Sequence, residues 1–186
     1  MNILQVGCHK CDDTLSKYIL SKGAKKVEHL ILIDIDESFV DIANRVYKDV
    51  NKLTTIVTAI TPDPNKSEII LYHVKSNMFS QHISFNYDHM SAHGHSPDKI
   101  ATVNHPARTI TSVLEEYNIE ELDEFHIDTE GLDVDILYSI NYDKYLIKKI
   151  TFEYVHCGRP FAGGQTPKLN NFLQYMKEKG YRHQPS

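Results

Sequence analysis

The chain has 186 residues, of which 41% are hydrophobic and 24% charged, and its formal net charge is −5. This size and composition predict an ordinary globular chain, and we expect one domain over residues 1–186. The lysines are scattered, and adjacent pairs such as Lys148-Lys149 are the nearest approach to a cluster. Because a basic face supplies most of the affinity for nucleic acid, this charge distribution argues against a nucleic-acid partner.

The sequence also argues against a membrane or secreted protein. No apolar run approaches the ~20 residues that a membrane span needs. The opening residues, Met1 to Gly7, lack the basic region and the long apolar core of a secretory signal. The three cysteines, an odd number, argue against a disulfide framework. We therefore expect a cytoplasmic protein.

Apolar runs alternate with helical periodicity along the chain. Strands are predicted over residues 3–6, 29–34, 54–60, 68–74, 124–128 and 149–154, the fourth of them as an arm of a hairpin. Helices are predicted over residues 14–20, 38–50 and 109–117, from residue 132 onward, and over 166–180. The run from Leu30 to Ile33 is wholly apolar, which is typical of a parallel strand covered on both faces. The alternation predicts an α/β fold with a doubly wound, mostly parallel, Rossmann-like sheet.

Residues 76–108 interrupt this alternation. The segment is polar, and Gly94 and Pro97 break it, so we expect a long insertion loop that serves a functional site and is mobile. His89 and His93 stand at helical spacing, which can place two imidazoles on one metal. Histidines in such loops more often bind substrate or are solvated, and we assign them no metal. The segment's histidines are His82, His89, His93, His95 and His105.

The ends of the first two predicted strands carry candidate ligand-binding residues. Gly7 follows the first strand, and Asp34 ends the second. The glycine lets a ligand approach the backbone, and the acid can accept hydrogen bonds from ribose hydroxyls. A dinucleotide fingerprint has three glycines, so the single glycine disfavours an NAD-dependent oxidoreductase. It favours a ligand that has a ribose and no pyrophosphate.

Cys8 and Cys11 form a CxxC pair between the first strand and the first helix. Such a pair could be a thioredoxin-like redox site, or could bind zinc together with Cys157 and nearby histidines. The chain has no second CxxC, and the flanking elements continue as a doubly wound sheet. Structural or ligand-lining thiols are therefore the favoured interpretation.

The segment Asp128-Thr129-Glu130-Gly131 lies between a predicted strand and a predicted helix. Ligands in open α/β sheets bind just past the carboxyl ends of the strands, so both carboxylates are site candidates. The alternative for Glu130 is that it caps the following helix. Glu153 ends the next strand, where it could bind a ligand or pair with a lysine.

Several short motifs follow one another along the chain in an order that is typical of one family. They are Val6-Gly7-Cys8-His9, Asp12-Asp13, Ile33-Asp34-Ile35, Ala59-Ile60, Ser84-Phe85 with His89 and His93, Asp128-Thr129-Glu130-Gly131, Glu153 and Gly180-Tyr181. In these motifs the chain resembles the FkbM-like family of S-adenosylmethionine-dependent methyltransferases, over nearly its whole length. The resemblance implies a class I methyltransferase fold. The chain stops where such a fold starts its final two-strand hairpin, so we expect the sheet to lack that hairpin. A homo-oligomer could then cover the exposed edge.

The resemblance also implies a function. It implies an O-methyltransferase that uses S-adenosylmethionine and acts on a hydroxyl of a sugar or another small metabolite, with a small-molecule or glycan acceptor. It assigns cofactor binding to Gly7, Cys8, His9, Asp34, Ile35, Ala59 and Ile60. It assigns catalysis to Asp128 and Glu130, and acceptor binding to His89, His93, Glu153 and His156.

In this scheme Asp128 stabilises the sulfonium, and Glu130 or a loop histidine removes the acceptor proton. Asp128 and Glu153 could also offer oxygen ligands to Mg²⁺, which would lower the pKa of the acceptor hydroxyl. The alternative from another class is a non-catalytic nucleoside-binding or scaffolding module of the same fold.

Overall fold

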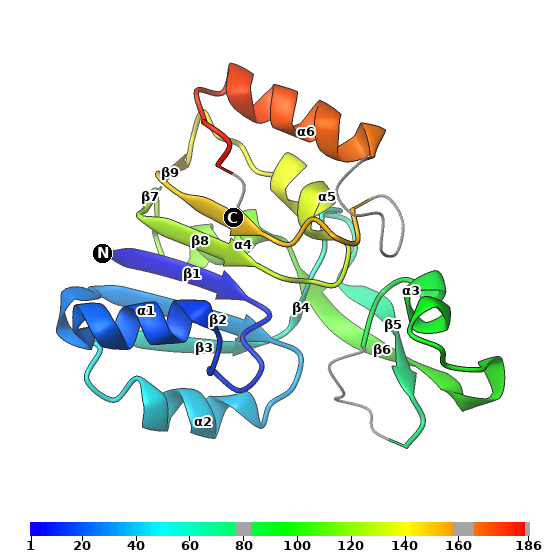
Figure 1. Ribbon diagram of the computed structural model, residues 1–186. Helices are drawn as coiled ribbons and strands as arrows, with labels where there is room; N and C mark the ends of the chain where they lie inside the picture. Colours follow the sequence, from blue (N-terminus) through cyan, green and yellow to red (C-terminus); the bar gives the residue numbers. More distant parts are fainter. Residues whose placement is uncertain (77–82, 158–165, 185–186) are drawn as a thin grey trace.

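The structure, a computed structural model, describes residues 1–76, 83–157 and 166–184 (Figure 1). Its strands are β1 (Asn2–Val6), β2 (His29–Asp34), β3 (Leu53–Val57), β4 (Ala59–Ile60), β5 (Glu68–Val74), β6 (Ile100–Arg108), β7 (Glu121–Leu122), β8 (Glu124–Ile127), β9 (Leu146–Ile147) and β10 (Ile150–Phe152). Its helices are α1 (Thr14–Lys22), α2 (Phe39–Val46), α3 (Tyr87–Ala92), α4 (Ile110–Glu116), α5 (Asp133–Tyr138) and α6 (Pro167–Glu178), with short 3-10 turns at Ala24–Lys26 and Pro97–Lys99.

The centre of the fold is a five-stranded sheet with the order β10-β8-β1-β2-β3. Every pairing within this sheet is parallel. The sequence prediction of a doubly wound, mostly parallel, Rossmann-like sheet is therefore confirmed. The strand order changes direction at β1, which makes the carboxyl ends of β1, β2 and β8 the expected place for a ligand.

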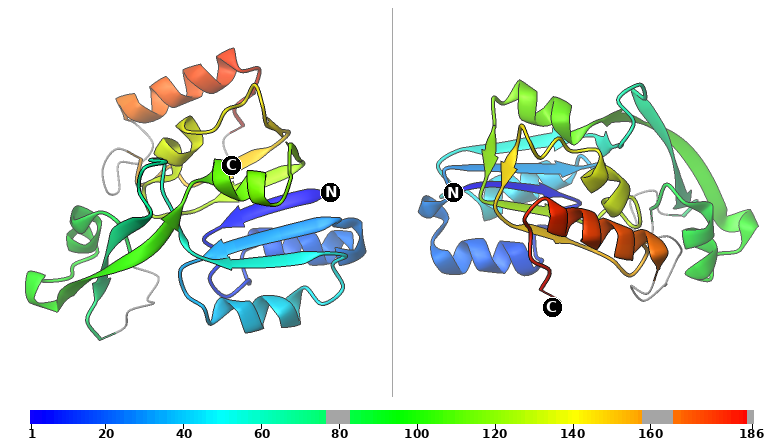
Figure 2. Two further views of the ribbon diagram at one scale, coloured as in Figure 1. Left: turned by 180° about the vertical axis from the view of Figure 1, so that it is seen from behind. Right: turned by 90° about the horizontal axis from the view of Figure 1, so that it is seen from above.

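Two apolar clusters cover the two faces of this sheet. Residues of β1, β2 and β8 that point to one face pack against α4, α5 and α6. Alternate residues of β1 and β2 point to the other face and pack against α1 and α2. Figure 2 shows α4 and α1 on opposite sides of the strands. Burial on both faces explains why the run from Leu30 to Ile33 is wholly apolar.

The residues that cap the N-termini of α4 and α6 are recognisable in the sequence. The side chain of Thr109 accepts a hydrogen bond from the Ser112 amide, and that of Thr166 accepts one from the Leu169 amide. Each satisfies a backbone donor that the first turn of a helix leaves free. The predicted starts of α4 and α6 are confirmed. None of the helices in the described ranges is both long enough and apolar enough to cross a membrane.

The prediction of an irregular loop over residues 76–108 was wrong for most of the described part. Residues 87–92 form α3, and residues 100–108 form β6, which pairs antiparallel with β5 along its length. Burial alternates along much of β6, with Thr102, Asn104 and Pro106 exposed, so the strand lacks an apolar run. The hairpin arm expected at residues 68–74 is confirmed as β5. His82 lies outside the described residues.

The strand predicted over residues 54–60 is divided between two sheets. β3 stays in the central sheet, and after Thr58 the chain turns into β4, which pairs with the end of β6. The Thr58 hydroxyl contacts the carbonyl oxygen of Pro106 at 3.1 Å and fixes this change of direction. The resulting three-stranded sheet, β4-β6-β5, extends with α3 beyond the carboxyl ends of the central strands (Figure 1). We call residues 68–76 and 83–108 the insertion.

Gly7 offers a test of the close contact between β1 and β8. Its φ is +75°, and a Cβ added there would lie 2.0 Å from the Asp128 carbonyl oxygen. Gly94 has a similar φ of +80° with nothing within 4 Å of an added Cβ. We expect Gly94→Ala to cost roughly 1–2 kcal/mol of unfolding free energy, from the backbone conformation alone. Gly7→Ala should cost ~2 kcal/mol more, because of the clash.

Urea unfolding of the two variants beside the parent protein measures this difference. Equal losses at the two glycines would contradict the close approach of the two strand ends.

Candidate functional site

One pocket lies at the carboxyl ends of the central strands, between the sheet and the insertion. The ends of β1, β2 and β8 form one side, and β5 with the segment 83–85 forms another. Its lining residues are Val6, Gly7, His9, Ile33, Asp34, Ile35, Asp36, Thr58, Ala59, Ile60, Ile69, Leu71, Ile83, Ser84, Phe85, Asp128, Thr129, Glu130 and Leu132. The pocket thus brings together six of the seven residues expected to bind cofactor and both residues expected to be catalytic.

Asp34 organises the two turns that follow β1 and β2. Its Oδ2 accepts a hydrogen bond from the His9 amide at 2.7 Å, and its Oδ1 accepts one from the Asp36 amide at 3.1 Å. An ionised carboxylate has about four acceptor sites, so these two bonds leave capacity for hydroxyl donors in the pocket. Gly7, His9 and Cys11, all in the turn after β1, have a positive φ.

Cys8 is the one predicted cofactor-binding residue that does not line the pocket. Cys8 and Cys11 are buried free thiols in the cluster under α1 and α2. Hydrogen bonding to Cys11 and burial raise the pKa of the Cys8 thiol. Cys157 belongs to the cluster on the opposite face of the sheet, so the zinc site considered for these three cysteines is not formed.

Asp133 holds the turn that carries Asp128 and Glu130. Its carboxylate accepts hydrogen bonds from the Thr129 hydroxyl at 2.9 Å, the Thr129 amide at 3.2 Å and the Gly131 amide at 3.3 Å. Sequence reasoning did not select this residue. The available signal was an acid two residues after Gly131, on a helix whose neighbouring residues are apolar.

Glu130 does not cap α5, so that alternative was wrong. Its φ is +55°, its carbonyl oxygen accepts a hydrogen bond from the Ser84 hydroxyl at 3.2 Å, and its carboxylate faces histidines. α5 has no side-chain cap at Leu132. The left-handed backbone at Glu130 directs the side chain toward the insertion rather than along the helix.

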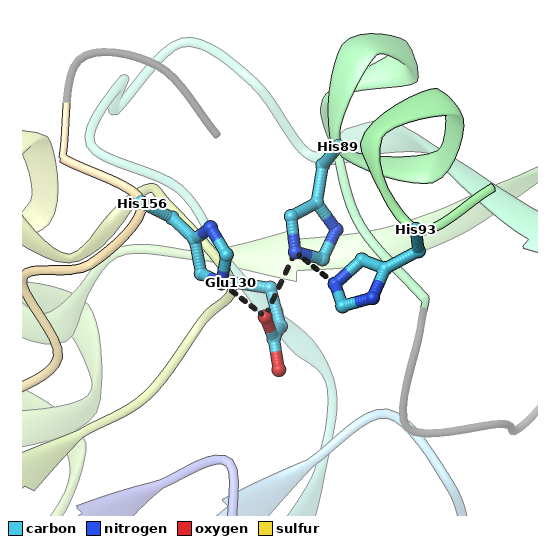
Figure 3. Close-up of side chains that lie close together, drawn as sticks. All are labelled: His89, His93, Glu130 and His156. Carbon is cyan, nitrogen blue, oxygen red and sulfur yellow. Dashed lines mark hydrogen bonds and ion pairs between the residues drawn. The ribbon is translucent and has the colours of Figure 1, made fainter. Parts of the chain in front are cut away.

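Figure 3 shows the group of side chains around this carboxylate, His89, His93, Glu130 and His156. Glu130 Oε2 lies 3.1 Å from His89 Nε2 and 3.6 Å from His156 Nε2. The Nε2 atoms of His89 and His93 lie 3.1 Å apart. All four donor atoms lie within 4.8 Å of one another, and we call these residues the histidine cluster. It adjoins the pocket through Glu130.

The three histidines expected to bind the acceptor therefore meet in one place, although none of them lines the pocket. Glu153 stands beside the histidine cluster, with its Oε2 3.9 Å from His156 Nε2, so a histidine takes the place of the lysine considered as its partner. The donor atoms that converge belong to the histidine cluster and not to the Asp128 and Glu153 pair considered for Mg²⁺.

Burial and neighbouring carboxylates raise the pKa values of three acids in and beside the pocket. Burial and the charge of Glu130 raise the pKa of Asp128 to about 6, although its side chain is open to the pocket. Burial and the charge of Asp128 raise the pKa of Asp133 to about 7. Burial, followed by the charges of Asp128 and Glu130, raises the pKa of Glu153 to about 8. A region with such concentrated negative charge favours a positively charged ligand.

Comparison with known proteins assigns the family. Residues 2–183 match the family described as the methyltransferase FkbM domain. The chain belongs to the FkbM methyltransferase family. No curated protein and no solved structure gives a significant match. The family match spans almost the whole chain, so the central sheet, the pocket and the insertion all lie within the FkbM methyltransferase domain.

The raised pKa of Glu153 predicts a pH-dependent stability. The folded state holds the Glu153 proton up to about pH 8, whereas the ordinary pKa is 4.5. The folded protein therefore binds more protons than the unfolded chain between these values, and its stability falls as pH rises through this range. We expect Glu153→Gln to stabilise the protein at pH 8.5 and to have little effect on stability at pH 4.5.

Thermal unfolding at the two pH values checks this. Glu37→Gln removes an exposed carboxylate and controls for the change in net charge. A Glu153→Gln effect of the same size at both pH values would argue against a buried, protonated Glu153.

Proposed function

We propose that this FkbM-family protein is an S-adenosylmethionine-dependent O-methyltransferase that acts on a hydroxyl of a sugar or another small metabolite. The observation that carries the proposal is that Gly7, Asp34 and Asp128, from the ends of three different strands, line one pocket. These are the positions at which an open α/β sheet binds its ligand.

The pocket has the residue types that S-adenosylmethionine requires. Asp34 offers carboxylate oxygens for the ribose hydroxyls, and Ile35, Ala59 and Ile60 supply an apolar wall for the base. The carboxylates of Asp128 and Glu130 supply negative charge for the sulfonium. When bound, S-adenosylmethionine supplies an electrophilic methyl group that an acceptor oxygen displaces in line.

Asp128 is the carboxylate that we assign to the reacting centre. It faces the pocket, and its pKa of about 6 keeps it ionised near neutral pH while allowing it to accept a proton. Glu130 also lines the pocket, but its Oε2 is already engaged by His89 and His156. Orientation and the exclusion of water supply most of the remaining rate in such a displacement.

The insertion supplies the acceptor side of the pocket in this proposal. Ile69, Leu71 and Phe85 form an apolar wall opposite the strand ends. Glu153 lies beside His156 and offers a carboxyl group to a hydroxylated acceptor. This combination of one apolar wall and a few polar groups is typical of small-molecule sites.

Asp34 tests the cofactor assignment. We expect Asp34→Ala to weaken S-adenosylhomocysteine binding by ~1.5–3 kcal/mol, because it removes hydrogen bonds to a charged group. Isothermal titration calorimetry measures the affinity, with NAD as a ligand that should not bind. Asp12→Ala removes an exposed acid from the turn after β1 that does not line the pocket, and this variant should bind normally. Unchanged affinity in folded Asp34→Ala would sink the assignment.

Asp128 tests catalysis separately from binding. Asp128→Asn keeps the shape and removes the charge, so we expect methyl transfer to fall at least tenfold, or ~1.4 kcal/mol of transition-state stabilisation, with folding retained. Asp133→Asn, which alters the acid that holds the same turn, should lower the melting temperature as well. Transfer of labelled methyl groups to a panel of sugars and hydroxylated metabolites measures turnover. Cofactor binding without turnover on any acceptor would favour a non-catalytic nucleoside-binding module.

A further inference from the structure

We propose that the histidine cluster is a binding site for a divalent transition metal of the zinc class, which fastens the insertion to the methyltransferase core. The ligands are His89 and His93 of the α3 segment, Glu130 of the turn after β8, and His156 of the segment after β10. The site shares Glu130 with the wall of the pocket, but the ion itself takes no part in methyl transfer, and its binding does not depend on the function proposed above.

The distances fit one ion. In a tetrahedral zinc site with bonds of ~2.0–2.1 Å, neighbouring ligand atoms lie about 3.3 Å apart. The His89–Glu130 and His89–His93 contacts are 3.1 Å, and the His156–Glu130 contact is 3.6 Å. All four donor atoms lie within 4.8 Å of one another. Figure 3 shows the three rings gathered around the Glu130 carboxylate.

Hydrogen bonds explain this convergence only if the single N–H of one imidazole is shared between two acceptors. A ring nitrogen carries either one hydrogen or one lone pair, so it cannot donate to one group and accept from another. His89 Nε2 nevertheless lies 3.1 Å from both Glu130 Oε2 and His93 Nε2. Glu130 Oε2 in turn faces both His89 and His156. A cation that receives a lone pair from every one of these atoms satisfies all the contacts together.

The donor set selects the class of ion. Three imidazole nitrogens and one carboxylate oxygen suit zinc and similar transition metals, whereas Mg²⁺ and Ca²⁺ take oxygen ligands. The His89 side chain is 1% exposed and that of His156 is 7% exposed, so water is largely excluded from these two ligands. Four protein ligands leave no open position, which is typical of a structural site.

The position of the site explains what the ion does. His89 and His93 stand four residues apart on one side of α3, which lies in the insertion. Glu130 adopts φ of +55°, a conformation that persists when surrounding contacts hold it. An ion here joins three segments that are far apart in sequence. It also fixes the segment containing Ser84 and Phe85, which lines the pocket beside the cluster.

The test uses the full chain, stripped of metal with a chelator and titrated with Zn²⁺. We expect one high-affinity Zn²⁺ per chain and a rise in melting temperature on binding. Co²⁺ in the same site should give the strong visible absorption of a four-coordinate ion, without the near-ultraviolet band of cobalt–thiolate bonds. That band would indicate the cysteines instead and would overturn the proposal.

Variants locate the ion. His89→Ala and His93→Ala should each lower Zn²⁺ affinity by at least tenfold, since losing even an outer partner of a metal ligand costs roughly 10–100-fold. His126→Gln is the matched control, because His126, like His93, is a half-buried histidine, and it pairs with Glu124 at 2.9 Å outside the cluster. Circular dichroism tests whether each variant is folded. If one of the histidine variants does not fold, Glu130→Gln takes its place.

Two results would contradict the proposal. The first is a Zn²⁺ affinity that is the same in the cluster variants and in His126→Gln. The second is that the parent protein does not bind one Zn²⁺ per chain. Either result leaves the methyltransferase proposal standing, because that proposal is tested through Asp34 and Asp128, which are outside the cluster. If Asp34→Ala loses S-adenosylhomocysteine binding but binds Zn²⁺ normally, the cofactor site and the metal site are independent of each other.

Discussion

The close approach of Gly7 to the Asp128 backbone determines where the functional side chains of this protein lie. The parallel pairing of β1 with β8 brings the two strand ends together, and a side chain at Gly7 would collide with the Asp128 carbonyl oxygen. The pairing of β1 with β2 adds Asp34 to the same edge. The turns that carry Asp34 and Asp128 therefore meet around one pocket. Burial, followed by repulsion from neighbouring carboxylates, raises the pKa values of Asp128, Asp133 and Glu153.

Concentrated negative charge at a strand edge is costly unless something compensates it. Asp133 is compensated by the amide and hydroxyl groups of the turn that it holds. Glu130 is compensated by imidazoles from the insertion and from the segment after β10. In our proposals the remaining negative charge serves cations, with a sulfonium beside Asp128 and a divalent metal in the histidine cluster. The insertion is thus tied to the core by the same carboxylates that shape the pocket.

The central sheet could be predicted from the sequence because its signals are local. Apolar runs such as Leu30–Ile33 reflect burial on both faces, and Thr109 and Thr166 mark helix starts by their side-chain chemistry. The positions of Gly7, Asp34 and Asp128 at strand ends followed from the same signals. The family resemblance was confirmed over residues 2–183.

The rest depends on contacts between distant parts of the chain. β6 was missed because Thr102, Asn104 and Pro106 interrupt its apolar positions and its pairing partner β5 lies some thirty residues earlier. The helical spacing of His89 and His93 was visible in the sequence, but no spacing predicts that they meet Glu130 and His156. The left-handed backbone at Glu130, which turns its carboxylate away from α5, is likewise set by the surrounding fold.

The most direct test of the central claim is a crystal structure with S-adenosylhomocysteine bound. Our account predicts that the ligand occupies the pocket at the ends of β1, β2 and β8, with its ribose hydroxyls on Asp34 and its sulfur beside Asp128. A ligand bound elsewhere, or one whose sulfur is remote from Asp128, would contradict it.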